Sequence, residues 1–292
     1  MQRWVLSLGL ACAVATAPAA AQSTQKHFLW AVRVPDGPAT YLMGSLHVLT
    51  PDYYPLDARI EQAFAQSKVL IEEVDMDELI NPSAIMPLMA KAVYTDGRTL
   101  DQVISPELYK TVLARAEKAG IPSVAVQRMK PWMAAVSLTA PALKSAGFDA
   151  NLGVDKYFFD KAKSAGLERR ALETVAYQFD RLDQMPLALQ EAMLKSVFAD
   201  IDAQLGNVKT IADAWARGDT SGLEKDLLGA FRETPELFDR LLAERNRNWV
   251  APVEACLKAK TACFVVVGAA HLVGPESLVN LLQKKGYTVE QQ

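Results

Sequence analysis

The chain has 292 residues and a formal net charge of −3 at pH 7. This mild acidity, without any basic run, argues against nucleic acid as a partner. No segment beyond the first residues approaches the ~20 apolar residues that a membrane span needs, so we expect no transmembrane segment in the mature chain.

Residues 1–21 have the features of a secretory signal peptide. Arg3 supplies a positive charge, residues 4–11 form a short apolar run, and three alanines ending at Ala21 offer a small-residue cleavage site. Cys12 raises the alternative of a lipoprotein, but the residues before it do not match that pattern. We therefore expect cleavage near Ala21 and a periplasmic or secreted protein with one domain, residues 22–292.

The mature chain begins with a predicted β-hairpin. Its strands, residues 28–34 and 39–46, flank the turn sequence Pro-Asp-Gly-Pro. An amphipathic helix over residues 56–66 and a short buried strand over residues 69–74 follow. A helix between two strands predicts a βαβ unit with a right-handed crossover.

The middle of the chain is predicted to be mainly helical. Ser105 is a candidate N-cap with proline after it, and Gly120 marks the end of that helix. Two more helices are predicted over residues 131–145 and 153–165. We expect an inserted helical subregion near residues 81–150.

The second half returns to alternating elements. The predicted helices and strands are a strand at 167–172, helices at 187–205, 208–216 and 235–257, a strand at 262–267, a helix ending at 285, and a strand at 287–289. Strands at both ends with helices between them favour an α/β fold, with a central mixed β-sheet flanked by helices.

Two cysteines, Cys256 and Cys263, remain after removal of the signal peptide. In an exported protein such a pair suggests a disulfide, which here would tie a helix end to the next strand. The alternative is a thiolate metal site, for which the spacing is unusual.

Only three histidines occur, and two of them lie in the same frame. His47 ends Gly-Ser-Leu-His and His271 ends Gly-Ala-Ala-His, each directly after a predicted buried strand. A glycine turn at a strand end can place a reactive group over the edge of a sheet. Imidazole suits both metal binding and acid–base chemistry, although such a histidine can also be a core or capping residue.

Acidic residues also lie at predicted strand ends. Glu72 and Glu73 interrupt an apolar run and point to opposite faces of a strand, so at least one should meet a cation, a metal or hydrogen-bond donors. The alternative is an exposed strand end. Glu173 ends the strand near residue 172, where it is either functional or favoured by the dipole of the following helix.

A polar and charged run, Glu-Arg-Asn-Arg-Asn-Trp, lies on the predicted helix 235–257. Arg245 and Trp249 are one turn apart, and the aromatic residue suggests that their shared face is buried rather than a solvated surface. A buried arginine needs a carboxylate or an anionic ligand. The common signatures GxSxG, HExxH, GxxxxGK[ST] and CxxC are absent from the sequence.

Together these motifs resemble the TraB/GumN family over almost the whole mature chain. The matching segments are residues 28–30, 41–47, 54–56, 70–75, 153–155, 172–174 with 178, 215–219, 244–249 and 268–272. The resemblance implies a relation to Tiki-type metal-dependent peptidases, which carry paired GxxH motifs. It also implies a fold like those of the erythromycin-esterase-like and ChaN-like proteins.

The resemblance further implies that His47, Glu73 and His271 bind a divalent metal ion. Zn, Mn, Co and Fe all remain open. Glu173, Arg245 and Asn246 would complete the site: Glu173 as a further ligand or general base, and Arg245 and Asn246 as donors to a developing oxyanion or a substrate carboxylate. Glu72 takes a position that is apolar in the family.

We therefore predict an exported, metal-dependent hydrolase with peptidase-like chemistry. One alternative is a non-catalytic periplasmic protein that binds a metal, haem or another small ligand in the same pocket. Another, suggested only by the GumN name, is an accessory factor in envelope polysaccharide production. The sequence leaves the substrate and the oligomeric state open.

Overall fold

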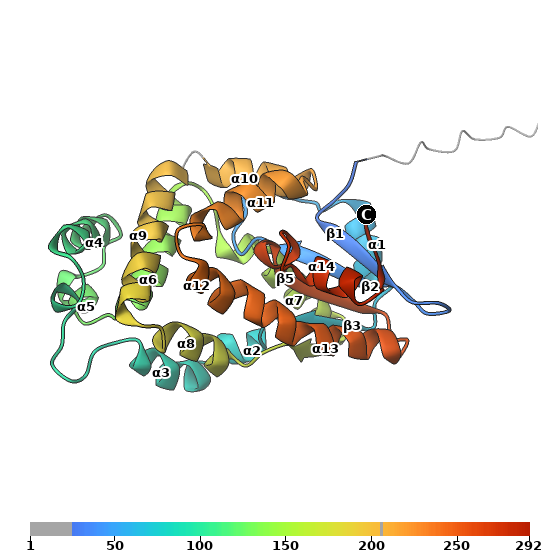
Figure 1. Cartoon of the computed structure of the whole chain (residues 1–292), viewed down its shortest axis with the longest axis horizontal. Coiled ribbons are helices and arrows are strands. Elements are labelled where there is room, and N and C mark those ends of the chain that lie inside the picture. Colours follow the sequence, from blue (N-terminus) through green and yellow to red (C-terminus); the bar gives the residue numbers. More distant parts are fainter. Residues whose placement is uncertain (1–24, 205–206) are drawn as a thin grey trace, which may run out of the picture.

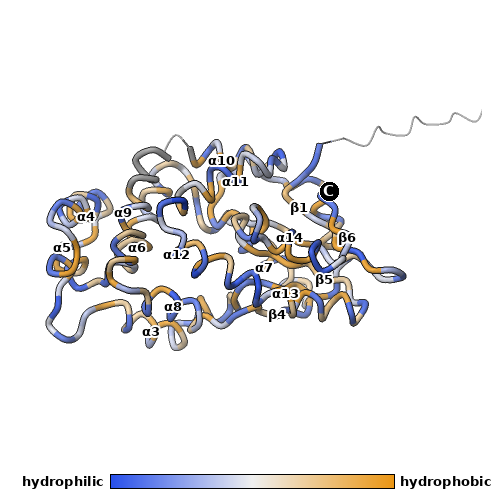
Figure 2. Tube along the Cα trace, viewed as in Figure 1, coloured by the Kyte–Doolittle hydropathy of each residue, from blue (hydrophilic) through white to orange (hydrophobic). Residues whose placement is uncertain are grey.

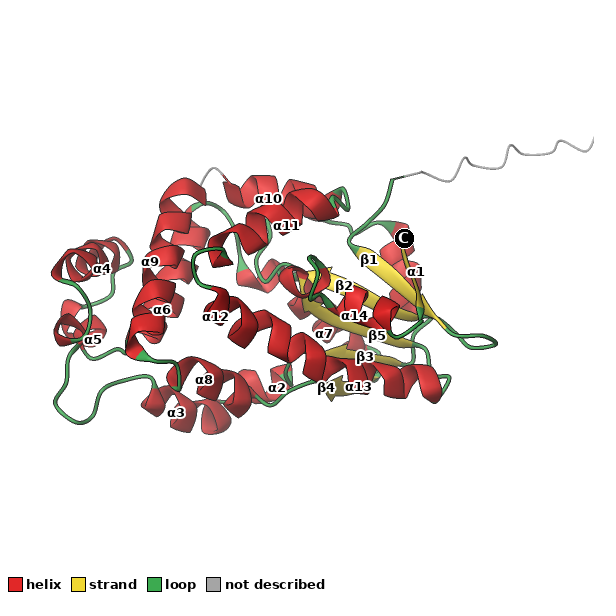
Figure 3. Cartoon of the chain, viewed as in Figure 1, coloured by secondary structure: helices red, strands yellow, loops and turns green. Residues whose placement is uncertain are grey.

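A mixed β-sheet forms the centre of the fold, as expected from the sequence (Figure 3). The computed structural model describes residues 25–204 and 207–292, so the expected signal peptide lies outside the described residues. The six strands are β1 (Leu29–Arg33), β2 (Thr40–Ser45), β3 (Val69–Glu72), β4 (Glu168–Ala171), β5 (Cys263–Gly268) and β6 (Thr288–Gln291).

The strand order is β4-β3-β5-β2-β1-β6. The strands β4, β3, β5 and β2 are parallel, whereas β1 runs antiparallel to β2 and β6. β1 and β2 form the predicted hairpin. The last strand pairs with the first, so the C-terminus lies beside the start of the described chain (Figure 1). The four parallel strands therefore end at the same edge of the sheet.

Helices cover both faces of the sheet. On one face, α1 (Ala58–Ala65) and α7 (Val154–Ser164) pack Phe64 and Phe158 against Phe264 of β5. On the other face lie α13 (Glu244–Lys258) and α14 (Leu278–Lys284), which stand in front of the strands in Figure 1. Because β5 is buried on both sides, it is a continuous apolar run, and the centre of the sheet is orange in Figure 2.

A helical region extends from the sheet (Figure 1). It contains α3 (Pro82–Lys91), α4 (Pro106–Lys118), α5 (Ser123–Gln127), α6 (Pro131–Ser145), α8 (Val175–Asp183) and α9 (Leu187–Gln204). The bounds of α4 and α6 agree with the helices predicted from the sequence. The predicted insertion at 81–150 is too short, because α8 and α9 share apolar clusters with the inserted helices.

The remaining helices connect this region to the sheet. They are α2 (Met76–Leu79), α10 (Asn207–Ala216), α11 (Thr220–Leu228) and α12 (Pro235–Phe238). The predicted span 235–257 is helical throughout, but a π-helical turn at Asp239–Ala243 separates α12 from α13. A π turn changes the direction in which later side chains point, and Arg245 is the second residue after it. No helix in the described ranges is long and apolar enough to cross a bilayer.

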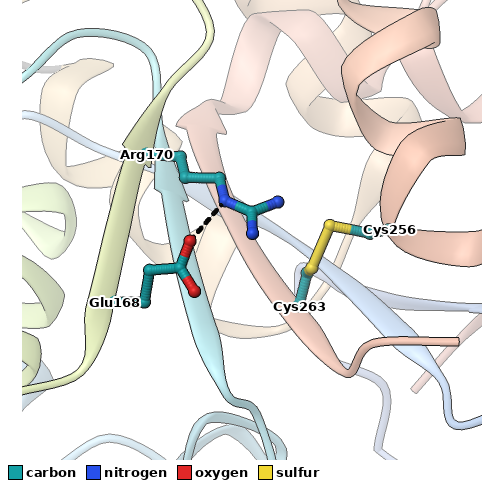
Figure 4. Close-up of a disulfide and its surroundings, with 4 residues drawn as sticks. All are labelled: Glu168, Arg170, Cys256 and Cys263. Atoms are coloured by element: carbon teal, nitrogen blue, oxygen red, sulfur yellow. Dashed lines mark hydrogen bonds and ion pairs between the residues drawn. A yellow bond between two sulfur atoms is a disulfide. The ribbon is translucent and has the colours of Figure 1, made fainter. Parts of the chain in front are cut away.

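The predicted disulfide is confirmed. Cys256 near the end of α13 bonds to Cys263 at the start of β5, and both residues are buried (Figure 4). On β4, which β3 separates from β5, Arg170 Nε lies 2.7 Å from Glu168 Oε1. The bridge therefore fixes the entry into the strand that leads to His271.

Replacing Cys256 and Cys263 together with alanine is expected to lower the free energy of unfolding by about 2 to 3 kcal/mol, because the unfolded chain gains the entropy of an open loop. Urea denaturation measures the loss. Reduced wild-type protein serves as the control, since it loses the bond but keeps both side chains. An unchanged midpoint in both proteins would show that the bond contributes nothing to stability.

Candidate functional site

The edge where the parallel strands end brings the predicted site residues together. His47 follows β2, Glu73 follows β3, Glu173 follows β4 and His271 follows β5. Pairing continues past the named strands, because the backbone N–H of Glu173 donates to the carbonyl oxygen of Glu73 at 2.8 Å. Ligand sites of parallel α/β sheets commonly lie at this edge.

Gly268 shows how closely three of these side chains converge. A Cβ added to this glycine would lie 3.3 Å from Glu73 Oε1, 3.6 Å from His271 Cδ2 and 3.8 Å from His47 Nε2. The two GxxH motifs and Glu73 therefore surround one small volume. A side chain at position 268 would fill that volume. This explains why the second GxxH motif begins with glycine.

The hydrogen bonds of Asn246 determine the tautomer of His271. The Asn246 amide nitrogen donates to the carbonyl oxygen of Glu276 at 2.8 Å, so its Oδ1 faces His271 Nδ1 at 2.6 Å. Because Oδ1 can only accept, Nδ1 carries the proton and Nε2 has a free lone pair. Burial lowers the pKa of His271 to about 3, so the ring is neutral, and Trp249 packs against it at a centroid distance of 4.4 Å.

His47 is held in a similar way by an acid. Its Nδ1 lies 3.1 Å from Asp155 Oδ1, at the start of α7, and its Nε2 points toward the volume beside Gly268. The charge of Asp155 raises the pKa of His47 above its usual value. The His47 side chain is 68% exposed, so solvent screens this attraction. A carboxylate behind a histidine is a common arrangement in metal sites.

Glu73 is ionised. Its Oε1 accepts from the backbone N–H of Gly268 at 2.7 Å, and its Oε2 accepts from Arg245 Nη2 at 2.6 Å and from Gln178 Nε2 at 3.2 Å. Burial opposes ionisation, but the charge of Arg245 and the Gly268 N–H together lower the pKa of Glu73 to about 2. Glu73 is therefore a carboxylate at neutral pH.

Arg245 connects Glu73 with Glu173. Its Nε lies 3.1 Å from both carboxylate oxygens of Glu173, and its guanidinium lies 4.7 Å from the centre of the Trp249 ring. The three ionic side chains are only 12%, 16% and 6% exposed for Arg245, Glu73 and Glu173. As expected for a buried arginine, Arg245 has carboxylate partners.

Two of the predicted site residues, Glu173 and Asn246, contact other site residues and hold them in place. Glu173 also accepts from Trp249 Nε1 at 2.9 Å and Gln178 Nε2 at 3.2 Å, so its oxygens are occupied by donors that fix Arg245. Asn246 is 2% exposed and donates to a backbone carbonyl. Both residues are thus placed to position Arg245 and His271.

Asp155 and Gln178 belong to the site although the sequence did not assign them a role. Asp155 begins α7 after Gly153, and a Cβ at Gly153 would come within 2.5 Å of the His47 carbonyl oxygen. This close contact is what brings Asp155 to His47. The only available signal was that both residues lie in segments shared with the TraB/GumN family.

Two cavities meet at His47. The first, of about 680 Å³, is lined by Ser45, His47, Glu72, Glu73 and Asp155, among others. The second, of about 500 Å³, lies between α6, α9 and α10 and is almost wholly apolar. His47 and Val136 line both, so a ligand in the first cavity can place an apolar group in the second.

The donor atoms suit a divalent metal, but Arg245 competes for them. Among the described residues, no group of three or more His, Cys, Asp or Glu side chains could hold a metal ion. At His271, the Nε2 lone pair faces Arg245 Nη1 at 3.2 Å. A metal ion at this nitrogen would have to replace that contact. The donor chemistry nevertheless fits, since two imidazole nitrogens and a carboxylate surround one volume.

A model of the TraB/PrgY/gumN family matches residues 28–291. The chain belongs to this family. It is also similar to the uncharacterised protein YbaP of Escherichia coli (strain K12), with 25% identity over 263 residues, which cover 88% of this chain and 94% of YbaP. YbaP of Shigella flexneri matches to the same extent.

Two more distant relatives are named as metalloproteases. Metalloprotease TIKI1 of Danio rerio is 24% identical over 333 residues, which cover 92% of this chain and 64% of TIKI1. Metalloprotease TIKI2 of Danio rerio is 23% identical over 326 residues, covering 92% of this chain and 61% of TIKI2. This chain thus spans less than two thirds of either protein. No solved structure matches, so the likeness to ChaN-like folds stays a prediction.

Proposed function

We propose that this protein is an exported, metal-dependent hydrolase that acts on a peptide or amide bond. The observation that carries the proposal is the convergence of His47 Nε2, His271 and Glu73 around Gly268. The distant similarity to proteins named metalloproteases supports the same reaction class. Export is supported by the signal-like N-terminus and by the disulfide, since such bonds persist in oxidising compartments.

In this proposal His47, His271 and Glu73 would hold a divalent metal, with Zn, Mn, Co and Fe all compatible. When bound, the metal supplies an activated water and a polarised carbonyl. Asp155 and Asn246 keep each histidine in the tautomer that leaves Nε2 free.

Arg245 is the donor that the substrate would meet. Its guanidinium can stabilise a developing oxyanion or bind a substrate carboxylate once it releases His271. Glu173 holds Arg245 in place through its Nε, and Gln178 bridges Glu173 and Glu73. Asn246 acts through His271, so it is a positioning residue.

A non-catalytic ligand-binding protein is the second candidate. It is favoured by the contact between Arg245 Nη1 and His271 Nε2, which satisfies the histidine without a metal, and by the adjoining apolar cavity. An accessory role in polysaccharide production stays a prediction.

Metal content tests the metal site on which the first candidate depends. Mature protein purified without chelator is expected to contain close to one equivalent of a divalent metal by elemental analysis. The double variant His47→Ala, His271→Ala is expected to lose the metal and remain folded, because its remaining site residues are still held by Arg245.

His27→Gln is the matched control, since this third histidine contacts Asp57 and Arg59 instead of the site. It should retain the metal. Unfolding of the double variant with unchanged metal content in the folded fraction would make the two histidines structural. Absence of metal from wild-type protein under every loading condition would favour the second candidate.

A further inference from the structure

Glu72 and Ser45 are two buried polar side chains whose hydrogen-bonding capacity is unused. Glu72 is 4% exposed and Ser45 is 2% exposed. Glu72 Oε1 and Ser45 Oγ are buried atoms without a hydrogen-bond partner. Leaving such groups unpaired costs on the order of 1 to 3 kcal/mol each, more for a charge. Both residues line the 680 Å³ cavity that His47 and Glu73 also line.

The alternation of β3 separates Glu72 from its neighbour. Glu73 turns toward Arg245 on α13, whereas Glu72 lies in register with Val266 of β5, which lines the same cavity. Ser45 ends β2 and is in register with Gly268. Glu72 and Ser45 therefore lie at strand ends beside the converging histidines, distinct from the ion pairs of Arg245.

Arg169 exerts the largest effect of any single charge on Glu72, and three carboxylates act against it. Asp155, Asp75 and Asp77 all disfavour an added negative charge on Glu72. Arg169 opposes them, but its guanidinium is engaged 2.7 Å from Asp77 and over the Phe159 ring. Glu73 does not add to this excess, because Arg245 neutralises it.

We propose that Glu72 and Ser45 form a subsite for a primary ammonium group of the substrate, supplied by a peptide amino terminus or a lysine side chain. An ammonium has three N–H donors and a positive charge, which matches two unpaired acceptor oxygens on residues of a cavity that Asp155 also lines. The apolar walls contributed by Val266, Val74 and Leu79 suit the carbon chain beside the nitrogen.

This subsite deepens the proposed function, because it names the group that would orient a substrate next to His47 and Glu73. Ammonium binding itself requires no metal and no turnover. The two proposals can therefore fail separately: a metal-loaded protein that never hydrolyses peptides would refute the hydrolase and leave the subsite intact.

Calorimetric titration of chelator-treated protein tests the subsite with three alanine tetrapeptide amides. One has a free amino terminus, one is acetylated, and one is acetylated with a single lysine. We expect at least one ammonium-bearing peptide to bind tenfold or more tighter than the blocked peptide. Which of the two it is identifies the source of the ammonium. Equal affinities for all three would overturn the proposal.

Glu72→Gln should abolish the preference for ammonium, and Ser45→Ala should reduce it by a smaller factor. Glu107→Gln makes the same charge change on the exposed start of α4 and should have no effect. Thermal unfolding shows whether each variant is folded, with Glu72→Leu as a second test of the same position. A folded Glu72 variant that retains the full preference would refute the subsite.

Discussion

Replacing Arg245 with methionine is expected to lower the free energy of unfolding of metal-free protein by about 3 to 5 kcal/mol. The variant keeps an unbranched side chain of similar length but removes the cation that pairs with Glu73 at 2.6 Å and Glu173 at 3.0 Å. Both carboxylates are largely buried, so the change leaves two poorly compensated charges. Chemical denaturation in the presence of chelator measures the loss.

The same variant is expected to bind a divalent metal more tightly. Arg245 Nη1 no longer faces His271 Nε2, and the site becomes more negative. Added metal should therefore restore more stability to Arg245→Met than to wild-type protein. A variant that metal does not stabilise would mean that Arg245 does not compete with a metal at this site.

Arg181→Met is the matched control. Arg181 is also largely buried and pairs with Glu244, but the Glu244 side chain is 38% exposed and can be solvated when its partner is removed. We expect a smaller loss of stability and no change in metal affinity. Equal losses of stability in the two variants would show that the pairing of Arg245 with two buried acids contributes no more to folding than the pairing of Arg181 with Glu244.

The sequence predicts best those elements whose ends carry local signals. Pro106 and Pro131 begin α4 and α6, and Gly120 and Gly147 follow their ends with positive φ angles. These signals depend only on neighbouring residues. By contrast, the apolar pattern of residues 235–257 continues through the π-helical turn, so it gives no sign of the turn that precedes Arg245.

The candidate site also has a part that the sequence predicts and a part that it does not. The strand ends and their glycines predict that His47 and His271 meet, and the family resemblance adds Glu73; parallel strands bring all three to one edge. The partners behind them could not be predicted. Asp155 reaches His47 through the close contact at Gly153, and Asn246 reaches His271 from the opposite face of the sheet, so both pairings depend on tertiary packing.

Glu72 illustrates a third case, in which the sequence offers two readings and burial decides between them. An exposed strand end was one alternative for the acidic pair, and the structure instead buries Glu72 to 4% exposure. The sequence pattern of a strand end does not reveal how deeply α7 covers it. The consequence is a carboxyl group whose protonation is linked to folding.

Glu72→Gln is expected to make metal-free protein more stable than wild type by an amount that grows with pH. Burial raises the pKa of Glu72 from 4.5 to about 8, with Arg169 opposing and Asp155 adding to the rise. The folded state therefore holds the proton more tightly than the unfolded state. Wild-type stability must fall as pH increases from about 4.5 and level off above about 8, while glutamine has no proton to lose.

The limiting slope is about 1.4 kcal/mol per pH unit, which sets an upper limit of about 5 kcal/mol for the difference at pH 8. Urea denaturation of both proteins in chelator, from pH 4.5 to pH 9, measures it. Glu107→Gln should differ from wild type by a small amount that does not follow this pH profile. A difference between Glu72→Gln and wild type that stays constant with pH would mean that Glu72 ionises normally in the folded protein. Its carboxylate would then need a cation or water that satisfies it inside the cavity.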